Sequence, residues 1–160
     1  NERLIPYAGA INPDTRTPQE FLQNPEDGIN CQLLVAVLAQ AMGRELPPLR
    51  SAELLADTEH TRFVDPSEIQ HGDIVFLTTE DENDPRFFHV GLVSIIDEEP
   101  HLVHIARHIG FAVTQRLREA IAHPLHARVA GVKRPVVESP DGQNLDFLVT
   151  YGFEHLAQTV

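Results

Sequence analysis

The sequence predicts one α+β domain, in which a buried helix packs on a small antiparallel β-sheet. Three observations lead to this prediction. A chain of 160 residues has the size of one ordinary domain. One uninterrupted apolar stretch near its start has the length of a helix, and several short β-prone runs follow at spacings typical of hairpins. Helices that are separated along the chain from an antiparallel sheet are typical of the α+β class.

The helical stretch runs from Cys31 to Met42 and contains no glycine or proline. Apolar residues occupy almost every position, so we expect this helix to be buried on most sides. Asn30 is a good N-cap and Gly43 a good terminator, which places Cys31 at the first helical position. Residues 1–29 are polar and rich in turn formers, and they predict no long element. Residues 51–57 suit a short helix, with Ser51 as its cap.

Short runs of β-prone composition follow, separated by turns that contain proline, glycine or acidic residues. We predict strands at 74–77, 87–96, 102–105, 111–114 and 128–133. The segment 117–122 predicts a helical turn that ends before Pro124. Residues 145–160 are apolar enough to pack, as a helix or as a strand followed by a helix. We expect a domain over 1–135 and a C-terminal extension, 136–160, packed on it.

The composition excludes several classes of partner. Lys and Arg total 12 against 24 Asp and Glu, so the formal charge is −12. A strongly acidic chain lacks the cationic surface that binds nucleic acid, and it is not attracted to anionic lipid. No apolar run approaches the ~20 residues that span a membrane as a helix. A single cysteine rules out an intramolecular disulfide and a zinc site built on paired cysteines.

Cys31 is the first candidate for chemistry. The N-terminus of a helix carries roughly half a positive charge, which stabilises a thiolate, and a neighbouring imidazole would lower the thiol pKa further. Such an imidazole would also act as general base and general acid. The alternative is that Cys31 is an ordinary core residue, because free cysteine is among the most buried residue types.

Two histidines on adjacent predicted strands provide candidate partners for this thiol. His89 lies between Phe88 and Val90, and His104 lies between Val103 and Ile105. Side chains on one face of two antiparallel neighbours lie about 5 Å apart, so one histidine can orient the other as the third member of a triad does. Each histidine taken alone is more often a hydrogen-bonded structural residue, but their coincidence with a cysteine at a helix start favours catalysis.

Other histidines have spacings that occur in metal sites. His101 and His104, and again His123 and His126, are three residues apart. No His-Glu-x-x-His motif and no second cysteine accompany them, so we expect no metal site. His108, His123 and His126 are interpreted as loop or surface residues.

Seven short pieces of the chain, taken in order, resemble one family. They are Pro6-Tyr7-Ala8-Gly9; Gly28-Ile29-Asn30-Cys31; Gly43-Arg44-Glu45-Leu46-Pro47 with Ser51-Ala52; His71-Gly72-Asp73-Ile74-Val75-Phe76; His89-Val90-Gly91-Leu92; Val103-His104-Ile105-Ala106; and Arg128-Val129-Ala130-Gly131-Val132-Lys133-Arg134. Over about residues 6–134 the sequence resembles the NlpC-type cysteine peptidases of bacterial cell walls, which have a papain-like core. The family usually reads Asp-Cys-Ser-Gly at the nucleophile, where this chain has Asn30, Cys31, Gln32 and Leu33.

The resemblance implies a thiol protease that cuts an amide bond of a peptidoglycan stem peptide, such as the bond between γ-D-glutamyl and a diamino acid. It implies Cys31 as nucleophile, His89 as base and His104 as the residue that orients the base. Substrate contacts are expected from four residues near the thiol, which are Tyr7, Asn30, Gln32 and Ser51. No metal or organic cofactor is expected, and the implied location is the periplasm, the cell wall or outside the cell.

Two other functions stay open at this point. Domains with the same core act as amidases, acyltransferases or secreted toxins against the walls of competitors, and the change at Gln32-Leu33 permits this. The chain is alternatively a non-catalytic module that binds wall peptides or a partner, with Cys31 buried and inert.

Overall fold

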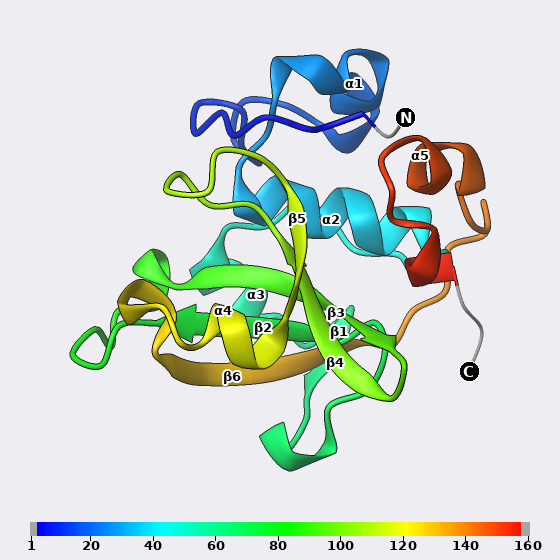
Figure 1. Ribbon diagram of the computed structural model, residues 1–160. Helices are drawn as coiled ribbons and strands as arrows, with labels where there is room; N and C mark the ends of the chain where they lie inside the picture. Colours follow the sequence, from blue (N-terminus) through cyan, green and yellow to red (C-terminus); the bar gives the residue numbers. More distant parts are fainter. Residues whose placement is uncertain (1–2, 158–160) are drawn as a thin grey trace.

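The computed structural model describes residues 3–157 and confirms the predicted α+β class (Figure 1). Among these residues, six strands form one antiparallel sheet in the order β1-β6-β2-β3-β4-β5. The strands are β1 (Thr61–Phe63), β2 (Ile74–Thr78), β3 (His89–Ile96), β4 (Glu99–His104), β5 (Val113–Arg116) and β6 (Arg128–Pro135). The helices are α1 (Pro18–Gln23), α2 (Cys31–Ala41), α3 (Ser51–Ala56), α4 (Leu117–Ala120) and α5 (Leu145–Thr150). The described residues also contain five 3-10 turns, η1 to η5, at Pro25–Asp27, Pro66–Glu68, Pro85–Phe87, Pro124–His126 and Glu154–Ala157.

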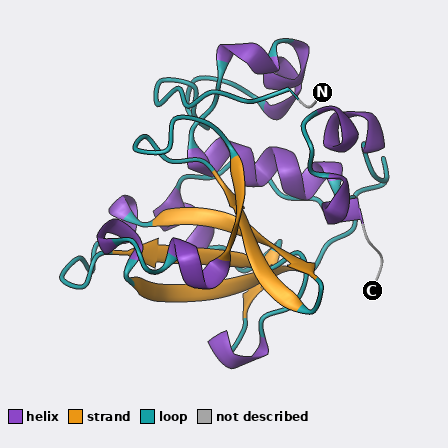
Figure 2. Cartoon of the chain, in the orientation of Figure 1, coloured by secondary structure: helices purple, strands orange, loops and turns teal. Residues whose placement is uncertain are grey.

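Helix α2 begins and ends as its sequence predicts. The Asn30 side chain accepts a hydrogen bond from the Leu33 N–H at 2.9 Å and so caps the first turn. Gly43 adopts a φ of 90°, in the left-handed region that glycine enters without steric cost, and the helix stops there. Eight of its eleven residues are buried. Figure 2 shows α2 lying against one side of the sheet, between the strands and the N-terminal segment.

The sheet has an apolar layer on each of its two faces. The five residues of β2 are all buried, and they alternate between the two layers. Ile74 and Phe76 belong to the core formed with α2. Val75 and Leu77 belong to a smaller cluster that includes Leu117 of α4. A strand buried on both faces reads as a continuous apolar run, as this one does.

The hairpin between β3 and β4 sets the register of the candidate site. Asp97 and Glu98 have φ values of 52° and 66°, which is the backbone of a tight two-residue turn. The resulting pairs run from Ile96 opposite Glu99 to Leu92 opposite Val103. β4 therefore begins three residues earlier than predicted, because the turn is shorter than the predicted 97–100 loop.

Several local predictions need correction. Ser51 does not cap α3; Arg50 holds that position, and its N–H donates to Glu53 Oε1 at 3.1 Å. β5 lies at 113–116, two residues after the predicted strand. Helix α1 and edge strand β1 were not predicted. Both elements are short. Helix α1 has a local signal in its capping box, in which Thr17 and Glu20 each accept a hydrogen bond from the other's backbone N–H, whereas β1 depends on pairing with β6.

The C-terminal segment packs on the outer side of α2. Phe147 of α5 contacts the ring of Phe21 edge-on, with ring centroids 6.3 Å apart. Leu148, Phe153 and Leu156 are buried in the core that contains α2. Residues 158–160 of the expected extension lie outside the described residues. Within the described range, no helix is both long enough and apolar enough to cross a bilayer.

Candidate active site

Cys31 and His89 line the same surface pocket. Cys31 is the first residue of α2 and is half-buried. Helix α2 packs against β3, whose first residue is His89. The pocket has a volume of about 450 Å³ and is lined by Tyr7, Cys31, His89, Ile105, Ala106, Arg107, His108, Leu125 and His126. Two larger hollows of about 690 Å³ lie elsewhere, one beside residues 139–146 and the other beside residues 42–44 and 69–72, and neither is lined by a cysteine or by His89.

The environment of the thiol differs from the sequence expectation. Burial raises the pKa of Cys31 above the ordinary thiol value, because a thiolate loses hydration inside the pocket. The backbone N–H groups of Val90, Cys31 and Gln32 oppose this shift. The helix N-terminus therefore acts on the sulfur, but desolvation is the larger effect. Cys31 in the free protein is a neutral thiol near pH 7.

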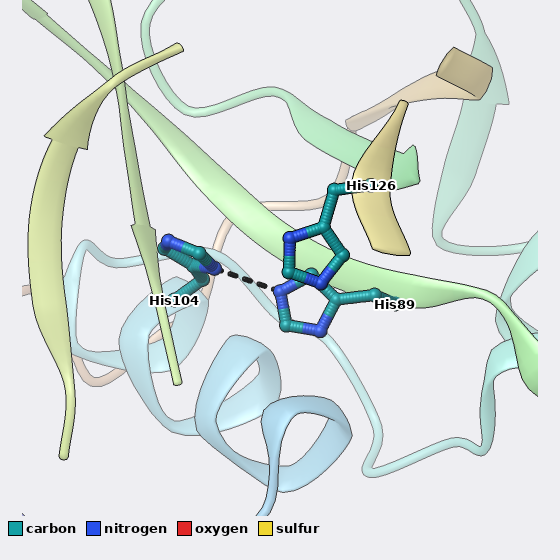
Figure 3. Close-up of side chains that lie close together, drawn as sticks. All are labelled: His89, His104 and His126. Carbon is teal, nitrogen blue, oxygen red and sulfur yellow. Dashed lines mark hydrogen bonds between the residues drawn. The ribbon is translucent and has the colours of Figure 1, made fainter. Parts of the chain in front are cut away.

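A chain of hydrogen bonds starts at His89 and runs away from the thiol. His89 Nε2 lies 2.7 Å from His104 Nδ1, and His104 Nε2 lies 2.6 Å from Gln115 Oε1 (Figure 3). The amide oxygen of Gln115 can only accept, so His104 carries its proton on Nε2. His104 Nδ1 is then an acceptor, and His89 must donate to it from Nε2. In the neutral form, His89 therefore keeps a lone pair on Nδ1.

The tautomer of His89 matters because of where its unprotonated nitrogen, Nδ1, points. Figure 3 shows the bonded nitrogen of His89 pointing at His104 and the other nitrogen, Nδ1, pointing away toward the side of α2. Cys31 is the first residue of α2 and lines the pocket with His89. A nitrogen with a free lone pair on that side is placed to take a proton from a thiol or from water.

Both histidines are held in the neutral state. Burial lowers the pKa of His89 well below its ordinary value, and the neighbouring His104, His126 and His108 lower it further. Burial also lowers the pKa of His104, while the hydrogen bond to Gln115 opposes that shift. Since a neutral imidazole is the form that accepts a proton, His89 is available as a base at neutral pH.

His126 is part of this cluster, although the sequence placed it on the surface. It is 5% exposed, and its ring stacks on that of His89 with centroids 4.2 Å apart and planes 14° apart (Figure 3). Burial and the neighbouring histidines lower its pKa to about 4. η4 brings it there from a segment that reads as a proline-containing loop. In the sequence, the one feature that drew attention to His126 was its three-residue spacing from His123, and that spacing does not indicate burial.

Two further residues that sequence reasoning missed hold His104 in place. Gln115 fixes its tautomer, as described above. Gly91 leaves the space in which His104 packs, because a Cβ at position 91 would lie 3.0 Å from the Cβ of His104 and 2.7 Å from the Leu102 side chain. The glycine of the His89-Val90-Gly91-Leu92 piece is therefore needed for close packing against β4.

The four expected substrate contacts have different positions. Tyr7 lines the pocket with Cys31. Asn30 is buried and its side chain caps α2. The side chain of Gln32 donates from Nε2 to Ser51 Oγ at 2.7 Å. Of these residues, Tyr7 alone is brought to the pocket.

Ser51 is fully buried and is engaged in a structural contact. Its hydroxyl donates to the Phe88 carbonyl at 2.8 Å while it accepts from Gln32. This chain links the first turn of α2 to the residue before His89. It therefore fixes the helix that carries the thiol relative to the strand that carries the base.

Among the spacings considered for metal, His101 and His104 are separated by the fold. Both lie on β4, three residues apart, so the alternation of a strand directs them to opposite faces. His101 Nδ1 is bonded to the Glu99 carbonyl at 3.0 Å. His123 and His126 lie at η4, and His108 lies close to both.

Comparisons with known proteins identify no family for this chain. No family model matches the sequence, and no curated protein matches it. One solved structure with local similarity is that of protein LPG0564 from Legionella pneumophila str. Philadelphia 1, described with the family model DUF1460. It is 18% identical, with a TM-score of 0.34, over 48% of this chain and 29% of that one. The chain thus spans less than a third of that structure, and the likeness assigns neither a family nor a function.

Proposed function

We propose that this protein is a cysteine hydrolase with a papain-like arrangement of its active site, in which Cys31 is the nucleophile. The observation that carries the proposal is the chain from His89 through His104 to Gln115, beside the pocket that contains Cys31. A base whose tautomer is fixed by a third group, next to a thiol at a helix start, is the arrangement that nucleophilic catalysis requires.

The proposed reaction begins with a neutral thiol. As Cys31 Sγ attacks the carbonyl carbon of an amide, its proton moves to His89 Nδ1. The imidazolium that forms still donates from Nε2 to His104 Nδ1, which holds the ring in place. The backbone N–H of Cys31, at the start of α2, is positioned to stabilise the developing oxyanion.

The second half of the reaction returns the site to its starting state. His89 gives its Nδ1 proton to the nitrogen of the leaving amine, and a thioester with Cys31 remains. Water then attacks the thioester, giving its proton to His89 Nδ1, and Cys31 leaves as the thiol after that proton returns to it. The proposed reaction steps involve no metal and no organic cofactor.

The substrate we propose is a peptide stem of peptidoglycan, cut at an amide bond such as that between γ-D-glutamyl and a diamino acid. The support for this choice is the order of the seven sequence pieces that resemble NlpC-type peptidases. An exported location, in the periplasm, the cell wall or outside the cell, follows from that substrate.

The experiment is digestion of defined stem peptides, with products identified by mass spectrometry. Cys31→Ala is expected to abolish cleavage, and His89→Ala to reduce it by about 10²–10⁴-fold, the usual contribution of a general base. His101→Ala is the matched control, because His101 lies on β4 but faces away from His104. Full activity in the Cys31→Ala protein would rule out the mechanism.

Two other functions use the same site differently. An amidase or acyltransferase would form the same thioester but pass the acyl group to another acceptor, and added hydroxylamine would then compete with water for it. The burial of the Cys31 thiol and its raised pKa favour a second alternative, a non-catalytic module that binds wall peptides. In that case the Cys31→Ala variant and the unaltered protein would bind stem peptides with equal affinity, and neither protein would cleave them.

A further inference from the structure

Five histidines form a continuous array that extends beyond the proposed triad. His89 and His104 belong to the hydrogen-bonded chain, and His126 stacks on His89. His126 also lies beside His108 and His123, with ring centroids 5.3 and 5.6 Å away. The rings of His108 and His123 are stacked on each other at 4.1 Å. The mechanism proposed above uses two of these five side chains and leaves the other three unassigned.

We propose that His108, His123 and His126 bind a divalent transition-metal ion, with Zn²⁺ as the expected ion. One ring nitrogen from each of the three lies within 4.8 Å of one from each of the others. Three imidazoles with a fourth position open to water are a common zinc coordination. The sequence predicted no metal here, because the chain has no His-Glu-x-x-His motif and no second cysteine; the third ligand, His108, lies on a different loop from the His123–His126 pair.

The ligand nitrogens need only a small adjustment to reach a tetrahedral ion. Zinc–nitrogen bonds of about 2.0–2.1 Å place ligand nitrogens about 3.4 Å apart, so the rings must close by about 1.4 Å at most. His108 is exposed, and its ring is free to turn away from its stacked position. Neither His108 nor His126 forms a side-chain hydrogen bond to another described residue, so their nitrogens are available as ligands.

His123 must exchange one contact for the metal. Its Nδ1 accepts a hydrogen bond from the Leu125 N–H at 3.1 Å. Coordination through Nε2 leaves the ring proton on Nδ1, so this cap is lost when the ion binds. Leu125 is 52% exposed, and its N–H can then be hydrated.

A second group of three, His89, His104 and His126, satisfies the same distance criterion but fits a metal less well. His89 Nε2 and His104 Nδ1 share one proton at 2.7 Å, and the other nitrogen of His104 is bonded to Gln115. A metal held by His89 Nε2 and His104 Nδ1 would break the buried hydrogen bond between these two nitrogens. The outer group gives up one bond at the surface, so it is the favoured site.

The test is Zn²⁺ binding to the purified, metal-free chain, measured by equilibrium dialysis. Binding is expected at one ion per chain. The double variant His108→Ala/His123→Ala alters residues near the surface and is expected to weaken binding by at least about tenfold, because even groups behind the ligands contribute 10–100-fold. Cys31→Ala and the control His101→Ala are expected to bind Zn²⁺ unchanged. Co²⁺ gives a second readout, since a site of nitrogen ligands lacks the charge-transfer absorption of a cobalt–thiolate bond.

Three results would overturn the proposal. The first is binding of the double variant with unchanged affinity. The second is loss of binding in Cys31→Ala, or a cobalt–thiolate band, either of which would place the ion on the thiol instead. The third is the absence of binding up to millimolar Zn²⁺. The outcome is independent of the proposed hydrolase, because dialysis measures the ion and needs no substrate.

Discussion

Replacing Gln115 by Leu tests the tautomer assignment on which the proposed mechanism depends. The variant introduces an apolar side chain of similar size and removes the oxygen that accepts from His104 Nε2. His104 is 1% exposed, so an N–H left there without an acceptor costs about 1–3 kcal/mol. The proton is therefore expected to move to His104 Nδ1, which then donates to His89 Nε2. His89 in turn carries its own proton on Nδ1 and has no lone pair for Cys31.

The expected loss follows from that energy. Each 1.36 kcal/mol corresponds to a factor of ten, so kcat/KM for stem-peptide cleavage should fall by about 5- to 150-fold in Gln115→Leu. Gln115→Glu keeps an acceptor in the same place and should retain the tautomer. The nitrogen chemical shifts of ¹⁵N-labelled histidines report the tautomer directly and need no substrate. If His104 kept its proton on Nε2 in Gln115→Leu and cleavage were unchanged, the proposed role of Gln115 would be refuted.

Three other predictions concern the scaffold and the thiol. Ser51→Ala leaves the Phe88 carbonyl without its buried partner and should lower the free energy of unfolding by about 1–3 kcal/mol in urea denaturation; an unchanged denaturation midpoint would contradict the structural role of this hydroxyl. Gly91→Ala places a Cβ 2.7 Å from the Leu102 side chain and should destabilise the protein by about 1–3 kcal/mol, which would be measured as a lower Tm. An unchanged Tm would mean that β3 and β4 are less tightly packed than the structure shows. Because the pKa of Cys31 is raised, only a small fraction of the thiol is ionised near pH 7. The rate of alkylation by iodoacetamide should therefore rise about tenfold for each pH unit until the pH reaches that pKa. A rate that no longer increases above pH 7 would show a preformed thiolate.

Much of the fold follows from local sequence. Helix α2 was predicted to within one residue because its ends depend on Asn30 and Gly43, which act through their own backbone and nearest turn. β2 was predicted because a strand buried on both faces leaves a continuous apolar run. β1 was missed, since a three-residue edge strand forms only when β6 is already there to pair with it.

The candidate site divides in the same way. Cys31, His89 and His104 were predicted as candidates because each lies at the start of a helix or within a short strand whose neighbours are apolar. Ser51 was also identified, but as a substrate contact, and the structure places it in the interior. Its burial depends on Phe88, which is 37 residues away along the chain.

The sequence by itself determined the class of fold, the helix start that carries the thiol, and the two candidate histidines on adjacent strands, because these depend on residue type and short-range periodicity. The tertiary structure decided the ionisation and the tautomers. Burial reverses the expected shift of the Cys31 pKa, and Gln115 directs the proton of His104. It also brought His126 and His108 next to the site from separate loops. Desolvation and contacts between distant segments exist only once the chain has folded, so no local pattern encodes them.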